Sequence, residues 1–89
     1  SNTLTQIRSF LAERFPGRGA ADLDQDAVDS ALTQAEDAVV RVQRSGQPIE
    51  LAPQDSYRRR LQHALVQEHG LRSESVGEEP FRRVVVFPD

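Results

Sequence analysis

SYRRRLQHALVQEH, the run from Ser56 to His69, is the most informative segment of this chain. If the run is helical, successive residues advance by about 100° around the axis, so side chains three or four positions apart share one side. Tyr57, Leu61 and Leu65 share such a side. The sequence therefore predicts an amphipathic helix that packs these three side chains into the core.

The opposite side of this helix carries a basic pair. Arg59 and His63 lie there one turn apart, next to Val66, and the pattern predicts that both basic side chains face solvent. From spacing alone, such a pair is more typical of ordinary solvated residues than of a site. Two observations favour binding: residues 58–60 are consecutive arginines, and a histidine changes charge near pH 6.5.

The composition is that of one small globular domain. With 89 residues, of which 37% are hydrophobic and 28% charged, the chain can form only a small core, and a large buried cavity is not expected. The absence of cysteine excludes disulfides and thiolate metal sites and is in keeping with a cytoplasmic location. No apolar run approaches the roughly 20 residues of a membrane span, so we expect no membrane contact.

The charge is distributed unevenly. The net charge of −3 argues by itself against nucleic-acid binding, but residues 1–56 hold five arginines against nine acids, and residues 57–89 hold six against five. A surface for anions is therefore expected in the second part. All eleven basic residues are arginine, which suits planar contacts to phosphates and bases, although a GC-rich genome explains the bias more simply.

Periodicity and turn residues predict the other helices. A short amphipathic helix and a surface linker are expected within residues 1–27. A longer helix is predicted from about Asp26 to Ser45, with Gly46 just after its end. Asp55 or Ser56 is expected to cap the helix that follows.

Three short strands complete the predicted elements. Residues 48–51 are bounded by prolines and indicate an edge strand, whereas residues 71–76 and 81–87 indicate a hairpin closed by a turn. On the last strand, alternation sends the side chains of Arg82 and Arg83 to opposite faces. One of the two is therefore placed to join the basic pair on the helix.

No convincing catalytic or metal-binding set is present. His63 and His69 are six residues apart, so a helix turns them away from each other and disfavours a metal site. The acidic pair at 78–79 lies in a predicted turn, where carboxylates are usually solvated. Ser73 and Ser75 share a strand face and could contact phosphate, but they lack a base for nucleophilic catalysis. We expect no enzyme activity, no metal and no cofactor.

Two runs carry a family resemblance. YRRRLQH at residues 57–63 and SESVGEEPFRRVVV at residues 73–86 resemble an R-3-H domain, named for arginine, three residues and histidine. The chain is most similar to the C-terminal domain of the bacterial Jag proteins, also called SpoIIIJ-associated or KhpB. The resemblance covers residues 28–88. It departs from the Jag pattern at Arg58 and Gln54, where an acid and a methionine are common.

This resemblance implies a fold, a function and a set of site residues. The implied fold is α+β, a small three-stranded antiparallel sheet with helices packed on it, here with an N-terminal helical extension in residues 1–27 before a binding domain in residues 28–89. The implied function is binding of single-stranded nucleic acid, RNA rather than DNA. The implied site residues, completed by their arginine neighbours, are Arg59, His63, Arg58, Arg60, Arg82 and Ser75.

Two further expectations follow. Jag proteins also carry a K-homology domain, whose Gly-x-x-Gly clamp this chain lacks, so we expect a fragment or a truncated homologue. A function from a different class also stays open: a protein-interaction or dimerisation module, in which the N-terminal helices dock a partner or a second copy. Salt titration separates the two functions, because nucleic-acid binding weakens steeply with ionic strength.

Overall fold

The computed structural model describes residues 25–89, so the expected N-terminal helix lies outside the described residues. The described part contains two helices and three strands. In chain order these are α2 (Gln25–Ser45), β1 (Ile49–Glu50), α3 (Ser56–Glu68), β2 (Arg72–Val76) and β3 (Arg83–Phe87).

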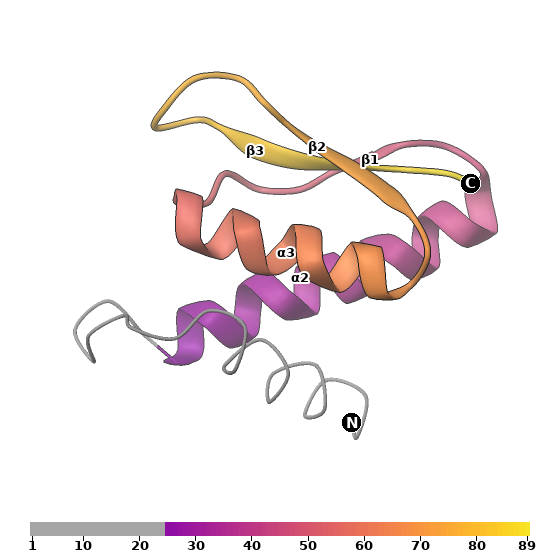
Figure 1. Cartoon of the computed structure of the whole chain (residues 1–89), viewed down its shortest axis with the longest axis horizontal. Coiled ribbons are helices and arrows are strands. Elements are labelled where there is room, and N and C mark those ends of the chain that lie inside the picture. The colour runs from indigo at the N-terminus through magenta and orange to yellow at the C-terminus, as the bar shows by residue number, and fades with distance from the viewer. Residues whose placement is uncertain (1–24) are drawn as a thin grey trace.

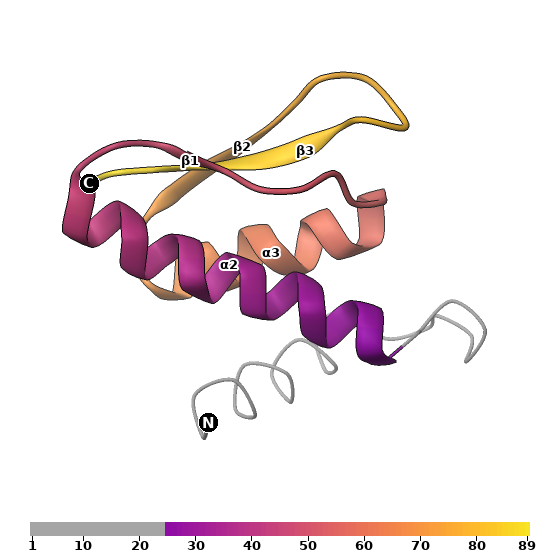
Figure 2. The ribbon, with the colours of Figure 1, turned by 180° about the vertical axis from the view of Figure 1, so that it is seen from behind.

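The three strands form one antiparallel sheet with the order β1-β3-β2. Both helices lie on the same side of this sheet, as the two opposite views show (Figures 1 and 2). Val84 and Val86 of the central strand are fully buried beneath the helices. The predicted α+β fold with a three-stranded antiparallel sheet is therefore confirmed for the described residues.

Helix α2 follows its predicted bounds within one residue. Its buried side is built mostly of small side chains, such as Ala31, Ala35 and Ala38, which let the neighbouring helix approach closely. Gly46 ends the helix with φ +69°, and its N–H donates to the Val42 carbonyl at 2.9 Å. The helix begins at Gln25, one residue before the predicted start at Asp26.

Helix α3 begins at the predicted cap. The Asp55 carboxylate accepts a hydrogen bond from the Arg58 N–H at 2.8 Å, which satisfies a donor left free at the helix start. Tyr57, Leu61 and Leu65 are buried, as predicted. Among residues 25–89, no helix is long and apolar enough to cross a membrane.

The opposite side of α3 is also covered, and here the sequence prediction was wrong. Arg59 is only 7% exposed and Val66 is fully buried, while His63 is half-buried. The physical reason is the fold of the hairpin: β2 returns alongside α3 and the two elements are in contact. A helix that packs against a second helix on one side and an edge strand on another buries side chains on both of these sides.

Candidate functional site

A histidine between two serines forms the centre of the candidate site. Nδ1 of His63 lies 2.6 Å from the Ser73 hydroxyl oxygen, and Nε2 lies 2.8 Å from that of Ser75. The two serines pair with Val86 and Val84 on β3, so all four side chains lie on the sheet face that meets the helices. Because alternate side chains of β2 point to the same face, Ser73 and Ser75 can each contact one nitrogen of the same imidazole ring.

The protonation state of His63 controls what these hydroxyls can donate. In the neutral ring one nitrogen accepts a hydroxyl hydrogen, and the other donates to the second serine, whose own hydrogen is then available. In the cation both nitrogens donate, and both hydroxyl hydrogens are available to a ligand. Burial lowers the pKa of His63, and the charges of Arg59 and Arg82 lower it further. Burial is the largest of these causes.

Arg59 is a bridge between two loops. One of its terminal nitrogens, Nη1, donates to the Gln54 carbonyl at 2.7 Å and to the Glu79 carboxylate at 3.2 Å. Gln54 lies before α3 and Glu79 in the loop between β2 and β3, so one guanidinium ties both loops to the helix. A buried arginine is stabilised by such charge-assisted bonds, which is why the side chain lies inward rather than in solvent as predicted.

The neighbouring arginines of α3 point in other directions. Arg58 forms an ion pair of 2.6 Å with Asp55 at the helix start, whereas Arg60 is exposed. Successive helical residues are about 100° apart, so three consecutive arginines cannot form one patch. Of the three, Arg59 is the one whose charge lowers the pKa of His63.

The two arginines of the hairpin separate, as expected. Arg82 precedes β3, donates to the Gly77 carbonyl at 2.8 Å and lies close enough to His63 to lower its pKa. Arg83 is the first residue of the strand and pairs with Glu50 of β1. Arg82, not Arg83, thus joins the surroundings of His63.

Two shallow hollows lie near this cluster. One, of about 210 Å³, is lined by His63 and Ser73 together with Gln67, Leu71 and Arg72. Another, of about 340 Å³, lies where the two loops tied by Arg59 meet, and Arg58 and Glu79 are among its lining residues. The site is therefore an open surface with shallow depressions, which suits an extended ligand better than an enclosed small molecule.

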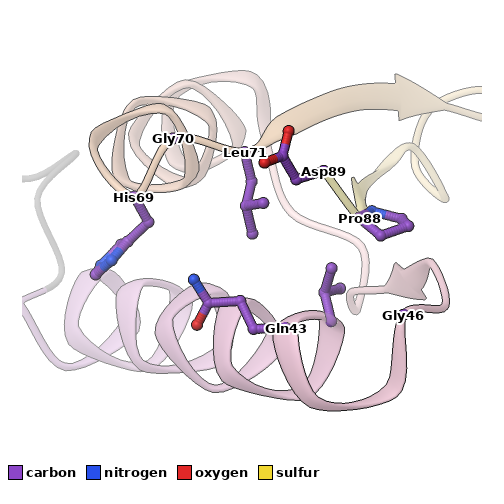
Figure 3. A pocket seen from close by; sticks show the side chains of 8 residues that line it. Gln43, Gly46, His69, Gly70, Leu71, Pro88 and Asp89 are labelled. Atoms are coloured by element: carbon purple, nitrogen blue, oxygen red, sulfur yellow. The ribbon is translucent and has the colours of Figure 1, made fainter.

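The second histidine belongs to a different region. His69 follows α3 and lines a pocket of about 310 Å³ between the turn before β2, the end of α2 and the last residues of the sequence (Figure 3). No arginine lines that pocket. Within the part of the chain that the structure describes, no group of three or more His, Cys, Asp or Glu side chains could hold a metal ion.

Sequence reasoning missed the partners of Arg59 and His63. Ser73 was expected only to be a polar strand residue that could contact phosphate, and Glu79 only to be a solvated turn residue, yet each is in contact with the basic pair. The available signal was Val66, an apolar residue on the side assigned to solvent. Its position indicates that another element covers that side of the helix.

Comparison with known proteins identifies a family and a relative. A family model that describes the R-3-H domain matches residues 30–88, which include every residue of the site described above. A protein of Porphyra purpurea, described as "Uncharacterized protein ycf45", is 39% identical over 41 residues. The aligned part covers 46% of this chain and 7% of that protein.

Proposed function

This chain belongs to the R-3-H domain family, and on that premise we propose that it binds single-stranded RNA. R-3-H domains are single-stranded nucleic-acid-binding domains, so nucleic-acid binding follows from the family. The preference for RNA and the residues that make the contact are the proposal.

The observation that carries the proposal is the cluster of His63 with Ser73 and Ser75. Hydroxyl groups and an imidazole can donate to phosphate oxygens and can both donate to and accept from the ribose 2′-hydroxyl. The 2′-hydroxyl is the group by which a protein distinguishes RNA from DNA at a given contact. A surface rich in groups that both donate and accept hydrogen bonds therefore favours RNA.

The arginines have separate roles in this proposal. Arg82 is half-buried beside His63 and supplies a guanidinium for phosphate. Arg58 and Arg60, both on α3, add positive charge to the side of the RNA site that the helix forms. Arg59 is buried, so we assign it the task of holding the two loops in position and of adding positive potential near His63.

Weak and sequence-tolerant binding is expected. The chain has a net charge of −3, and Glu74, Glu78 and Glu79 are exposed near the cluster. The backbone contacts proposed here carry no sequence information. Affinity should therefore depend on strand length and salt more than on base sequence.

Fluorescence anisotropy at low salt tests the proposal. Wild-type protein should bind a labelled single-stranded RNA more tightly than a DNA strand of the same sequence, and an RNA duplex most weakly. Arg82→Ala should weaken RNA binding about ten-fold, which is 1.4 kcal/mol and typical of one charged hydrogen bond. Arg44→Ala is the matched control, because Arg44 is an exposed arginine in the last turn of α2. Equal weakening by both variants, or tighter binding of the duplex, would contradict the proposed site.

The remaining expectations stay predictions. The dimerisation or protein-interaction function depends on N-terminal helices, the first of which lies outside residues 25–89. The specific likeness to Jag proteins and the cytoplasmic location also await direct tests, and the relative from Porphyra purpurea, described as uncharacterised, decides neither.

A further inference from the structure

One aromatic side chain of the described residues stands in solvent. Phe81, in the loop between β2 and β3, is 68% exposed, far more than any other large hydrophobic side chain in residues 25–89; Val40 of α2 follows at 39%. A phenyl ring in water gains nothing from the hydrophobic effect. The ring therefore contributes little to the fold and is available to a ligand.

The backbone that carries this ring is held in place. The Phe81 N–H donates to the Glu78 carbonyl at 2.7 Å, and the Phe81 carbonyl accepts from the Arg83 guanidinium at 3.2 Å. Gly77 starts the loop with φ +85°, and a β-carbon there would lie 2.5 Å from Nη1 of Arg83. An exposed ring on an ordered loop can bind at a smaller entropic cost than a ring on a mobile one.

The loop that carries Phe81 also lies next to the proposed RNA site. Arg82 follows it in the chain and is near enough to His63 to affect its pKa. The same loop contributes Glu79 to Arg59 at the start of α3, and Figure 1 shows the loop at the end of the sheet above that helix start. A strand whose phosphate contacts Arg82 would therefore have a neighbouring base within reach of Phe81.

We propose that the Phe81 ring is a stacking platform for one unpaired base of the bound strand. This inference rests on the proposed function and adds a residue and a mode of contact to it. Base stacking on an aromatic ring is tolerant of sequence, because every base has a π-face. It also requires an unpaired base, and so accounts for a preference for single strands that phosphate contacts alone do not explain.

A nucleobase suits this ring better than a protein surface does. The residues next to Phe81 in the sequence are charged or proline: Glu78, Glu79 and Pro80 before it, and Arg82 and Arg83 after it. Protein interfaces bury a contiguous patch with an apolar centre, whereas stacking needs only one accessible ring face. An isolated ring among charged groups fits the second case.

Substitutions at Phe81 test the platform through binding and fluorescence. Phe81→Ala and Phe81→Leu should each weaken RNA binding at least about five-fold, the lower limit for loss of one stacked base, and leave the melting temperature unchanged. Leucine keeps an apolar side chain but has no π-face.

Val40→Ala is the control and should bind as the wild type does. The chain contains no tryptophan, so Phe81→Trp introduces a single reporter whose emission should be quenched when the RNA binds.

An abasic strand separates stacking from phosphate contact. Wild-type protein should lose affinity for a strand of the same length that lacks bases, and Phe81→Ala should bind both strands equally. If Phe81→Ala binds normal RNA as the wild type does while Arg82→Ala is weakened, the platform is wrong and the proposed function stands. If wild-type protein binds no single strand at low salt, both fail. If Phe81→Ala instead turns a self-associating protein into a monomer in sedimentation, the ring covers a protein surface and the platform is overturned.

Discussion

At the scale of single residues, the imidazole of His63 is the group whose chemistry changes most easily. Its contacts with two hydroxyls mean that one proton alters the donor pattern presented to a ligand. Bound phosphate favours the protonated form of His63, while burial and two arginines lower the pKa of His63 in the free protein. Binding is therefore coupled to proton uptake.

RNA affinity should rise as the pH falls from about 7.5 to 5.5. The change should be about 1 kcal/mol, because a half-exposed contact is screened by solvent. His63→Gln should flatten the dependence, and His69→Gln should keep it, since His69 lies in a different pocket. Anisotropy titrations at constant ionic strength measure this, and a flat wild-type profile would leave His63 with an uncharged role.

Folding stability should show the opposite trend with pH. The pKa of His63 in the folded protein is lowered, whereas in the unfolded chain it has the ordinary value of about 6.5. As the pH falls through that value, the unfolded chain takes up the proton first and is favoured. The free energy of unfolding should thus decrease from about pH 7.5 to 5.5, and by less in His63→Gln. Urea denaturation at several pH values checks the sign.

Arg59 and Arg82 should differ in what their removal changes. Arg59→Ala leaves the Gln54 carbonyl and the Glu79 carboxylate without their donor, so it should destabilise the fold by about 1 to 3 kcal/mol. Arg82→Ala should chiefly affect binding. Thermal denaturation of both variants, with Arg44→Ala as control, separates a structural arginine from a binding one. An Arg59→Ala protein as stable as the wild type would remove the bridging role.

At the scale of elements, local signals were sufficient to predict the helix bounds and the hairpin. Asp55 and Gly46 act within a few residues of themselves, and each behaves as expected. The coverage of α3 depends instead on where β2 returns in space, which no local pattern specifies. Arg59 was therefore assigned to solvent, because arginine is rarely buried without a partner and its partners lie in other segments.

The buried stripe of α3 provides a prediction at this scale. Leu61 is 2% exposed and belongs to the core cluster, so Leu61→Ala should cost about 2 to 4 kcal/mol through lost burial and the cavity left behind. Gln67→Ala, on the exposed side of the same helix, should change stability by less than about 0.5 kcal/mol. Chemical denaturation of both variants measures the difference. Equal stabilities would contradict the packing of α3 described above.

At the scale of the whole molecule, the charge distribution determines how binding responds to salt. The net charge is negative, so attraction comes from a local group of arginines rather than from the molecule as a whole. Each phosphate contact to a single strand contributes about 0.7 to the slope of log affinity against log salt. Arg82→Ala should lower the slope by that amount, and Arg44→Ala should not. Identical slopes in the two variants would show that only overall charge matters.

The position of β2 at the edge of the sheet has a consequence for motion. Among the described strands it has a neighbour on one side only, and edge elements are where native proteins open first. The bonds from Ser73 and Ser75 to His63 fasten this strand to α3 by side chains. The groups that would meet a ligand are thus the same ones that restrain local opening of the strand. A ligand bound at the site should therefore change the rate at which the backbone amides of β2 exchange their hydrogens with solvent.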